Sequence, residues 1–391
     1  MDRPTLSHSS SPVVPLRLNL REDLTLRRAG RPDNPVLFDI IRSAPMRGDV
    51  AIYLDRSPDF FTLTDIREGR ARISIAEHDK KPVGAMVEMV NDYFFRGRPV
   101  RVLNTGDMRV TSAKHGAGIG ALMIAHAKAR LVSGEVDLGM VEMMRGNDGV
   151  RRLAEKVLHP DVRITSGGYY GVYQILPFHL WPGFSGSRLI RQARQSDLPA
   201  IAALMRDYYK DYCGIPDFSQ AWLEQLLSRH PSISLENLRV VERRGEITAC
   251  AAVWDQTAFR RPVLVDQTRK YRWVRRLVSM FRMPLGLQPL PGQGESWSVL
   301  NLCFMSCRRD REGDLKHLVR TLVKMAGETK NFHFVQVAMH EREPARRCLK
   351  GLLRTRVDYE IFYHTRAADP QTPAPVEELG QAIPWIEFAW V

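Results

Sequence analysis

The sequence lacks several features that would place it in a specialised class. No run approaches eighteen consecutive apolar residues, so no transmembrane helix is predicted. The first twenty residues are rich in serine and proline without the apolar core of a signal peptide, and we expect residues 1–20 to form a flexible arm. The five cysteines are odd in number and dispersed, which fits neither a disulfide framework nor a metal site. Reduced thiols and a cytoplasmic location follow as predictions.

Acidic residues are also in short supply. The chain has 44 Asp and Glu against 57 Lys and Arg, for a formal net charge of +13. This imbalance favours acidic partners, such as phosphorylated cofactors, anionic substrates, membrane surfaces or nucleic acid. At 391 residues, of which 44% are hydrophobic, the chain fits two globular domains of ordinary size.

The stretch from Met108 to Met123 combines a strand, a glycine-rich turn and a helix. A β-branched run over 101–111 predicts the strand, and an apolar helix begins at Ala121. Three glycines lie between them at alternate positions: Gly116, Gly118 and Gly120. Because glycine has no Cβ, the N–H groups of such a loop can converge on a phosphate at the positive end of the following helix. A tight turn without a ligand is the alternative.

The spacing of these glycines limits the choice of phosphate ligand. It is G-x-G-x-G, which differs from the G-x-G-x-x-G of dinucleotide-binding loops, and the Gly-Lys-Ser/Thr ending of a P-loop is missing. The segment from His115 to Gly120 instead resembles the Q/R-x-x-G-x-G/A signature of the GCN5-related N-acetyltransferases. His115 departs from the Gln or Arg of that signature. The resemblance implies an acetyl-CoA cofactor that acts as acyl donor.

A second match lies downstream at the spacing that this resemblance implies. Residues 140–144 predict a buried strand, and a helix follows from Asn147. The segment 147–156 is similar to the family's N-x-x-A-x-x-L-Y-E-K pattern. Asn147 is expected to cap the helix with its side-chain oxygen, and the resemblance implies that it also touches the cofactor. Ala154 stands where the family often has a tyrosine that serves as general acid.

The resemblance therefore implies a cofactor site on the end of the fourth strand, the glycine loop and the next helix. Backbone N–H groups near Met108 would polarise the thioester carbonyl. The predicted cofactor-binding residues are Met108, Arg109, Val110, His115, Gly116, Ala117, Gly118, Ile119, Gly120, Ala121 and Asn147.

A general base is needed because an ammonium group is not a nucleophile. The position where several family members have a carboxylate, early in the fourth strand, is Asn104 here and cannot act as a base. Glu142, on the predicted fifth strand, is the first candidate. A carboxylate that only pairs with Arg145 or Arg109 is the alternative.

A general acid must also be found elsewhere, since Ala154 replaces the usual tyrosine. Tyr170 is the first candidate, followed by Tyr169 and Tyr173. Each of these tyrosines could instead be an ordinary core residue.

The same order of predicted elements occurs twice. We predict an α+β fold with two tandem acetyltransferase-like domains, each with a mixed, mainly antiparallel central sheet flanked by helices. The predicted limits are an arm (1–20), a first domain (21–180), a linker (181–187), a second domain (188–365) and a C-terminal tail (366–391). Within the first domain the pattern predicts a strand at 24–28, helices at 34–42 and 58–66, strands at 71–78 and 82–95, and closing strands near 164 and at 170–175.

The second copy differs at the place of the phosphate loop. Residues 309–314 contain one glycine and three acidic residues, whose bulk and charge would oppose a pyrophosphate. We therefore predict that the second domain is degenerate and that coenzyme A binds once per chain, in the first.

An insert at 260–282 is strongly basic. Apolar residues recur within it at helical spacing and predict an amphipathic helix: Trp273, Val274, Leu277, Val278 and Phe281. The helix could pack its apolar stripe on its own domain, adsorb to an anionic membrane surface, or bind nucleic acid or another acidic partner. No base-stacking module is recognisable, so nucleic acid is not the expected partner.

Together these features predict an N-acyltransferase that moves an acetyl group from acetyl-CoA to a primary amine of a small molecule or a protein. A longer acyl donor stays open. Two alternatives remain from other classes. One is a pseudoenzyme that binds coenzyme A without turnover, because Asn104 and Ala154 are unsuitable for proton transfer. The other is an adaptor that docks on an acidic surface through the insert.

Overall fold

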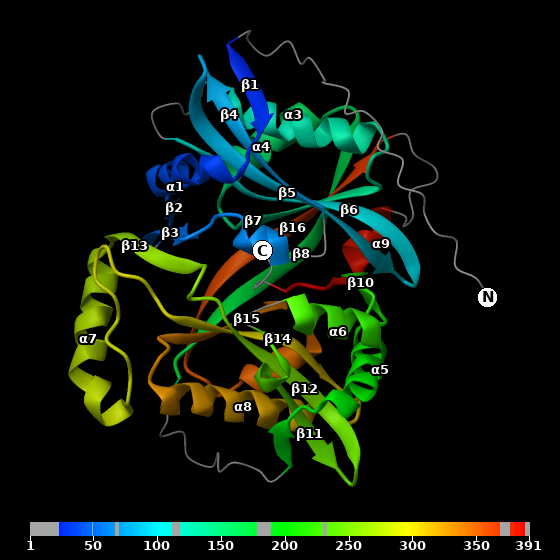
Figure 1. The fold of residues 1–391 in the computed structure, drawn as a ribbon, viewed down its shortest axis with the longest axis vertical. Coiled ribbons are helices and arrows are strands. Elements are labelled where there is room, and N and C mark those ends of the chain that lie inside the picture. Colours follow the sequence, from blue (N-terminus) through cyan, green and yellow to red (C-terminus); the bar gives the residue numbers. More distant parts are fainter. Residues whose placement is uncertain are drawn as a thin grey trace.

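One large mixed sheet runs through the whole molecule (Figure 1). A computed structural model describes residues 23–48, 50–66, 70–111, 118–177, 189–229, 233–367 and 376–387. The sheet has 14 strands, of which twelve follow the order β1-β4-β5-β6-β7-β16-β8-β15-β14-β12-β11-β9. The predicted arm and linker lie outside the described residues. Among the helices described, none combines the length and apolarity needed to span a bilayer.

The first half contains eight strands and four α-helices among its described residues. In chain order they are β1 (Leu24–Arg28), α1 (Asn34–Ser43), β2 (Met46–Arg47), β3 (Val50–Asp55), α2 (Thr62–Ile66), β4 (Arg70–His78), β5 (Lys81–Phe95), β6 (Arg98–Val110), α3 (Ile119–Val132), β7 (Leu138–Met144), α4 (Asp148–Leu158) and β8 (Val162–Ile175).

The second half repeats this order with additions. Its elements are β9 (Ile190–Gln192), α5 (Leu198–Tyr209), β10 (Tyr212–Ile215), α6 (Gln220–Arg229), β11 (Leu238–Arg243), β12 (Glu246–Asp255), β13 (Arg261–Gln267), α7 (Arg269–Leu285), β14 (Val299–Cys307), α8 (Glu312–Thr329), β15 (Phe334–His340), β16 (Arg354–Arg366), α9 (Val376–Gln381) and β17 (Ile383–Pro384). The predicted fold class is confirmed: the protein is α+β, with tandem halves and a mainly antiparallel sheet flanked by helices.

The two halves begin with the same local structure. Arg27 on β1 pairs with Asp33, six residues later, at an Nη2–Oδ1 distance of 2.8 Å. Arg191 on β9 pairs with Asp197 at the same spacing, with an Nη1–Oδ2 distance of 2.6 Å. In both halves the aspartate ends a single 3-10 turn that leads into the first long helix. The repeat inferred from the order of elements therefore extends to individual side chains.

The halves are joined by an exchange of strands. β16, from the second half, lies between β7 and β8 of the first and is antiparallel to both. β8 in turn pairs with β15 of the second half. Figure 1 shows β8 and β16 running through the middle of the molecule, between the two halves. Each half thus depends on the other to complete its sheet, while the domain limits predicted above remain predictions.

Several elements differ from those expected. β8 is a single long strand where two closing strands were predicted, and the helix expected over 58–66 is reduced to α2. The start of the basic insert is a strand, β13, which joins β3 and β2 in a separate three-stranded sheet. The helix of the insert, α7, begins only at Arg269, where the side-chain oxygen of Thr268 accepts from the Tyr271 N–H at 3.3 Å. Pairing with the first half, which local sequence does not encode, makes β13 a strand.

Candidate functional site

β6 and β7 separate in the middle of the first half. They pair in parallel from Val102↔Leu138 to Thr105↔Val141, and both then continue, to Val110 and Met144. A cavity of about 1350 Å³ lies at this separation and is lined by residues of both halves. Pockets for drug-sized ligands measure about 300–1,000 Å³, so this one can hold a large substrate.

A β-bulge in β6 accompanies the separation. Two residues, Asp107 and Met108, stand opposite the single residue Met86 of β5. Asp107 has a φ of 45°, in the left-handed region that side chains other than Asn, Asp and Gly rarely adopt. Bulges re-aim backbone groups next to sites. Predicted residues Met108, Arg109 and Val110 all line the cavity.

The glycine loop can be described only at its end. His115, Gly116 and Ala117 lie outside the described residues. Gly118 is the N-cap of α3, with a φ of 86° that a Cβ would strain. The free N–H groups of this 14-residue helix start here and favour an anion.

The three residues after Gly118 have mixed roles. Ile119 buries its side chain in the core of the first half, so only its backbone remains available to a ligand. A Cβ on Gly120 would stand 3.1 Å from Leu153 Cδ2, so this glycine lets α3 and α4 pack closely. Ala121, in the first turn of α3, is half-buried.

Asn147 is the N-cap residue of α4, but its side chain makes no capping hydrogen bond within the described residues. The prediction of a side-chain cap is wrong because the φ and ψ of Asn147 are −85° and 53°, away from the extended conformation that aims an N-cap side chain at the helix. Asn147 instead lines the cavity together with Ala154.

The two predicted catalytic residues are in direct contact. The Tyr170 hydroxyl, from β8, donates a hydrogen bond to the Glu142 carboxylate on β7, across β16. Tyr170 is fully buried and stacks on Tyr359 with ring centroids 5.2 Å apart. Burial, and then the charge of Glu142, raise the pKa of Tyr170 well above its usual value. The phenol therefore keeps its proton and holds the carboxylate.

The residues proposed as alternative partners of Glu142 have other contacts. Arg109 Nη2 lies 3.7 Å from Asp107 Oδ1, and the guanidinium of Arg145 lies over the Tyr169 ring. Asn104, on the paired part of β6, accepts a hydrogen bond of 2.9 Å from Asn91 Nδ2.

Two buried arginines at this cavity were not recognised from the sequence. Arg56 follows β3, is 4% exposed, pairs with Asp107 and lies 4.8 Å over the Phe60 ring. Arg260 precedes β13 and is 7% exposed, with Nη1 donating to Gln256 Oε1 at 3.3 Å. Burial and the neighbouring Arg56 lower the pKa of Arg260 to about 10. The sequence pattern placed Arg260 at the start of a basic amphipathic insert, and only the packing of the halves reveals that it is buried.

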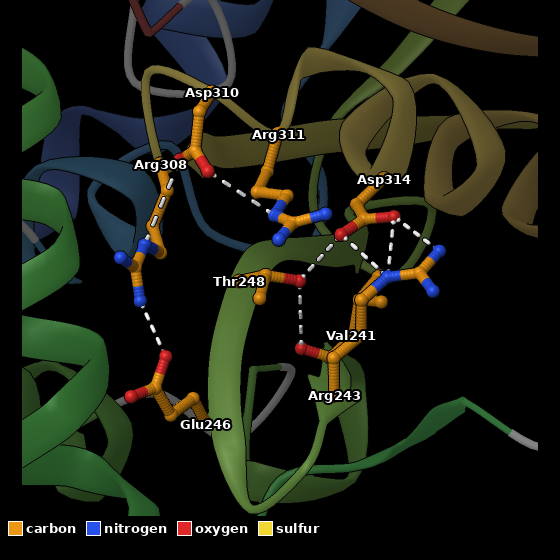
Figure 2. Close-up of polar contacts among 8 residues, drawn as sticks. All are labelled: Val241, Arg243, Glu246, Thr248, Arg308, Asp310, Arg311 and Asp314. Carbon is orange, nitrogen blue, oxygen red and sulfur yellow. Dashed lines mark hydrogen bonds and ion pairs between the residues drawn. The ribbon is translucent and has the colours of Figure 1, made fainter.

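The second half carries an acidic side chain at the matching helix start (Figure 2). Asp314, in the first turn of α8, accepts from Arg243 Nη2 at 2.7 Å and from the Thr248 hydroxyl at 2.8 Å. Burial alone would raise the pKa of Asp314, but these hydrogen bonds outweigh it and lower the pKa. A carboxylate of the chain itself thus lies at the end of α8 that would otherwise favour a bound anion.

Comparisons with known proteins support the same fold. The sequence matches no protein family model and no curated protein. The structure is similar to that of Saccharomyces cerevisiae N-myristoyltransferase with bound myristoyl-CoA, at a TM-score of 0.59 and 10% identity, over 99% of this chain and 94% of that one. It is also similar to a GCN5-related N-acetyltransferase from Sphaerobacter thermophilus, at a TM-score of 0.56 and 12% identity, over 89% and 97% of the two chains.

At these identities the likeness establishes the fold. The chain has the tandem GCN5-related N-acetyltransferase fold, as the motifs predicted, and it spans nearly the full length of both solved structures.

Proposed function

We propose that this protein is an acyl-CoA-dependent N-acyltransferase whose one donor site lies in the first half. The observation that carries the proposal is the cavity at the separation of β6 and β7, which adjoins the bulge of β6 and the pair Glu142 and Tyr170. A fold alone does not assign a function, and these groups supply the chemistry. A cytoplasmic location, where acyl-CoA donors are found, is part of the proposal.

The donor would lie along the separated strands. The start of α3 at Gly118 favours the negative pyrophosphate of coenzyme A. Backbone N–H groups at the bulge, around Asp107 and Met108, would polarise the thioester carbonyl.

The length of the acyl group that the donor carries is a separate question. The motifs predict acetyl, but the cavity continues along an apolar wall between β6, α3 and α4. This wall includes Leu103, Ile124, Leu131 and Leu158, and Ile164 of β8 lies beside it. N-myristoyltransferase of the same fold holds myristoyl-CoA. We therefore propose a donor longer than acetyl, with acetyl-CoA as the smallest one accepted.

Glu142 would take a proton from the acceptor ammonium, and the neutral nitrogen would attack the thioester carbonyl carbon. The C–S bond then breaks, and the second proton of the nitrogen passes to the departing sulfur, directly or through water. Tyr170, predicted as the acid, is proposed here to position Glu142, because its hydroxyl proton is already donated to that carboxylate.

The test is release of free coenzyme A by the intact chain. Acetyl-, octanoyl- and myristoyl-CoA are each supplied with a mixture of primary amines, small molecules and peptides. We expect turnover with at least one donor and a higher kcat/KM for the longer chains. Tight binding of every donor without turnover would instead favour the pseudoenzyme.

A second role is proposed for α7, which lies at the edge of the molecule in Figure 1. Its apolar stripe packs only in part: Tyr271 and Val278 line the cavity, but Trp273 is 65% and Met280 70% exposed. Leu277 and Phe281 are exposed beside them. Residues 269–285 include six Arg and Lys and no acidic residue. Exposed aromatic and methionine side chains on a basic helix are typical of adsorption to anionic bilayers.

Vesicle sedimentation tests this role. We expect binding to phosphatidylglycerol vesicles that weakens with salt, little binding to phosphatidylcholine vesicles, and loss of binding in the double variant Trp273→Ser, Phe281→Ser. Equal sedimentation of the variant and the parent chain would argue against α7 as the contact.

A further inference from the structure

The buried side chain of Arg56 has one nitrogen without a counterpart. Its Nη2 donates to Asp107 and its face covers Phe60. Within the described part of the chain, Nη1 is buried and has no hydrogen-bond acceptor. Arg56 is 4% exposed and lines the cavity. A buried guanidinium N–H without an acceptor is costly, and such groups are normally satisfied by a partner.

Three arginines gather at this point of the cavity. Arg56 and Arg109 share a single carboxylate, that of Asp107. Arg260 lies within electrostatic range of both Arg56 and Asp107, and the three arginines all line the cavity. A planar guanidinium matches a carboxylate in geometry and charge.

This cluster is next to the acylation chemistry. Arg260 also lies within electrostatic range of Tyr170 and Tyr359, the stacked rings beside Glu142. An amine at Glu142 and an anion at Arg56 would therefore be groups of one small molecule.

We infer that the acceptor is an amine that also carries a carboxylate, such as an amino acid, with the carboxylate bound by Arg56 and Arg260. This inference rests on the proposed N-acyltransferase function. It assigns the amine to Glu142 and makes the product an N-acyl amino acid. Arg56 acts as a specificity-determining residue and takes no part in proton transfer.

The experiment compares acceptors that differ only in the carboxylate. Turnover of the intact protein is measured with an amino acid and with its amide, at equal concentrations of the neutral amine. Because hydrogen bonds to charged groups are stronger than those between neutral groups, we expect kcat/KM to favour the acid by roughly tenfold or more. Arg56→Gln should reduce this ratio severalfold, with Arg260 still in place, and Arg56→Lys, which keeps the charge, should restore part of it.

The ratio serves as its own control, because a general loss of folding lowers both rates together. Equal rates of the parent chain with acid and amide would overturn the inference and leave the proposed function intact.

Binding without turnover separates the two proposals. Titration of the protein with an N-acyl amino acid and with the corresponding N-acyl amide should show tighter binding of the acid, with the difference reduced in Arg56→Gln. That result in a protein that transfers no acyl group would support the carboxylate site and contradict the acyltransferase. Equal affinities would contradict the carboxylate site.

Discussion

The two halves share the same order of elements but differ at the start of one helix. This helix is α3, after β6, in the first half and α8, after β14, in the second. α3 starts at Gly118, whose left-handed conformation presents backbone without a side chain. α8 starts with two acidic residues in its first turn, and one of them, Asp314, is held by Arg243 and Thr248. The first arrangement favours an external anion, whereas the second satisfies the helix with an anion of the chain itself.

The space between separating strands also differs between the halves. The strands are β6 and β7 in the first half and β14 and β15 in the second. Both β6 and β14 carry a residue with positive φ, Asp107 in one and Phe304 in the other. At β6 the separation opens into the large cavity. At β14 the Phe304 N–H donates to Glu387 at 2.9 Å, and the cavity there measures only about 30 Å³.

The C-terminal residues explain this contrast. Residues 384–387, with Trp385 buried and Glu387 half-buried, line what is left of the space between β14 and β15. One half thus keeps a cavity, and the other uses the equivalent space for its own chain. The same fold can therefore carry a ligand site or a packed core, depending on what fills the separation.

The largest effect is expected at Glu387. Burial raises the pKa of this carboxyl from 4.5 to about 8. The folded protein then binds a proton more tightly than the unfolded chain, so the contribution of Glu387 to stability falls as pH rises from about 4.5 to about 8. Glu387→Gln, which stays neutral, should gain stability relative to the parent chain over this interval, by a few kcal/mol (about 1.4 per pH unit at most).

Denaturant unfolding of both proteins across pH measures this difference. A difference that does not change with pH would contradict a raised pKa of Glu387.

The second effect concerns the half that keeps its cavity. Glu142→Gln retains shape and polarity but cannot take a proton. Turnover should fall by roughly a hundredfold, within the range for lost general base catalysis, while donor binding is unchanged. Raising the pH should restore part of the rate, since more acceptor is then neutral.

The matched control is Glu328→Gln, on the exposed side of α8, which should turn over normally. Normal turnover in Glu142→Gln would exclude Glu142 as the base.

The third effect tests whether the second half has lost its donor site. Asp314→Asn should cost about 1–3 kcal/mol of unfolding free energy, because Arg243 and Thr248 lose a charged acceptor. Calorimetry should still find one coenzyme A per chain, at the affinity of the parent protein. The titration uses the intact chain, since β16 completes the sheet of the other half. Binding of a second coenzyme A by the parent chain would show that the second half is competent.

The smallest effect is expected on the affinity for coenzyme A, when two substitutions of Gly118 are compared. Gly118 has positive φ, a conformation that Asn and Asp tolerate better than other side chains. Gly118→Asn and Gly118→Asp therefore have similar strain and bulk but differ in charge. Coenzyme A should bind at least tenfold more weakly to the Asp variant than to the Asn variant, about 1.4 kcal/mol. Equal affinities would mean that no phosphate lies at the start of α3.

Much of the secondary structure of the first half could be predicted from the local pattern of the sequence. Asn147 was placed correctly at the start of α4, and Gly118 was placed in the turn before α3, although this helix begins at Ile119, two residues before the predicted Ala121. Their conformations were not accessible, and the side-chain cap expected of Asn147 was wrong for that reason. Glu142 and Tyr170 were singled out separately, from positions on two strands, and their contact depends on β16 lying between those strands.

The sequence by itself determined the tandem plan, most of the elements of the first half and the contrast between a glycine loop and an acidic one, because periodicity and turn residues act over short separations. Only the tertiary structure decided which strands complete which sheet, since pairing across the chain depends on packing of both halves. The same holds for the burial of Arg56 and Arg260 and for the C-terminal residues beside β14. The charge and hydropathy of a residue do not reveal which distant surface will cover it, and at this cavity that surface comes from the other half of the chain.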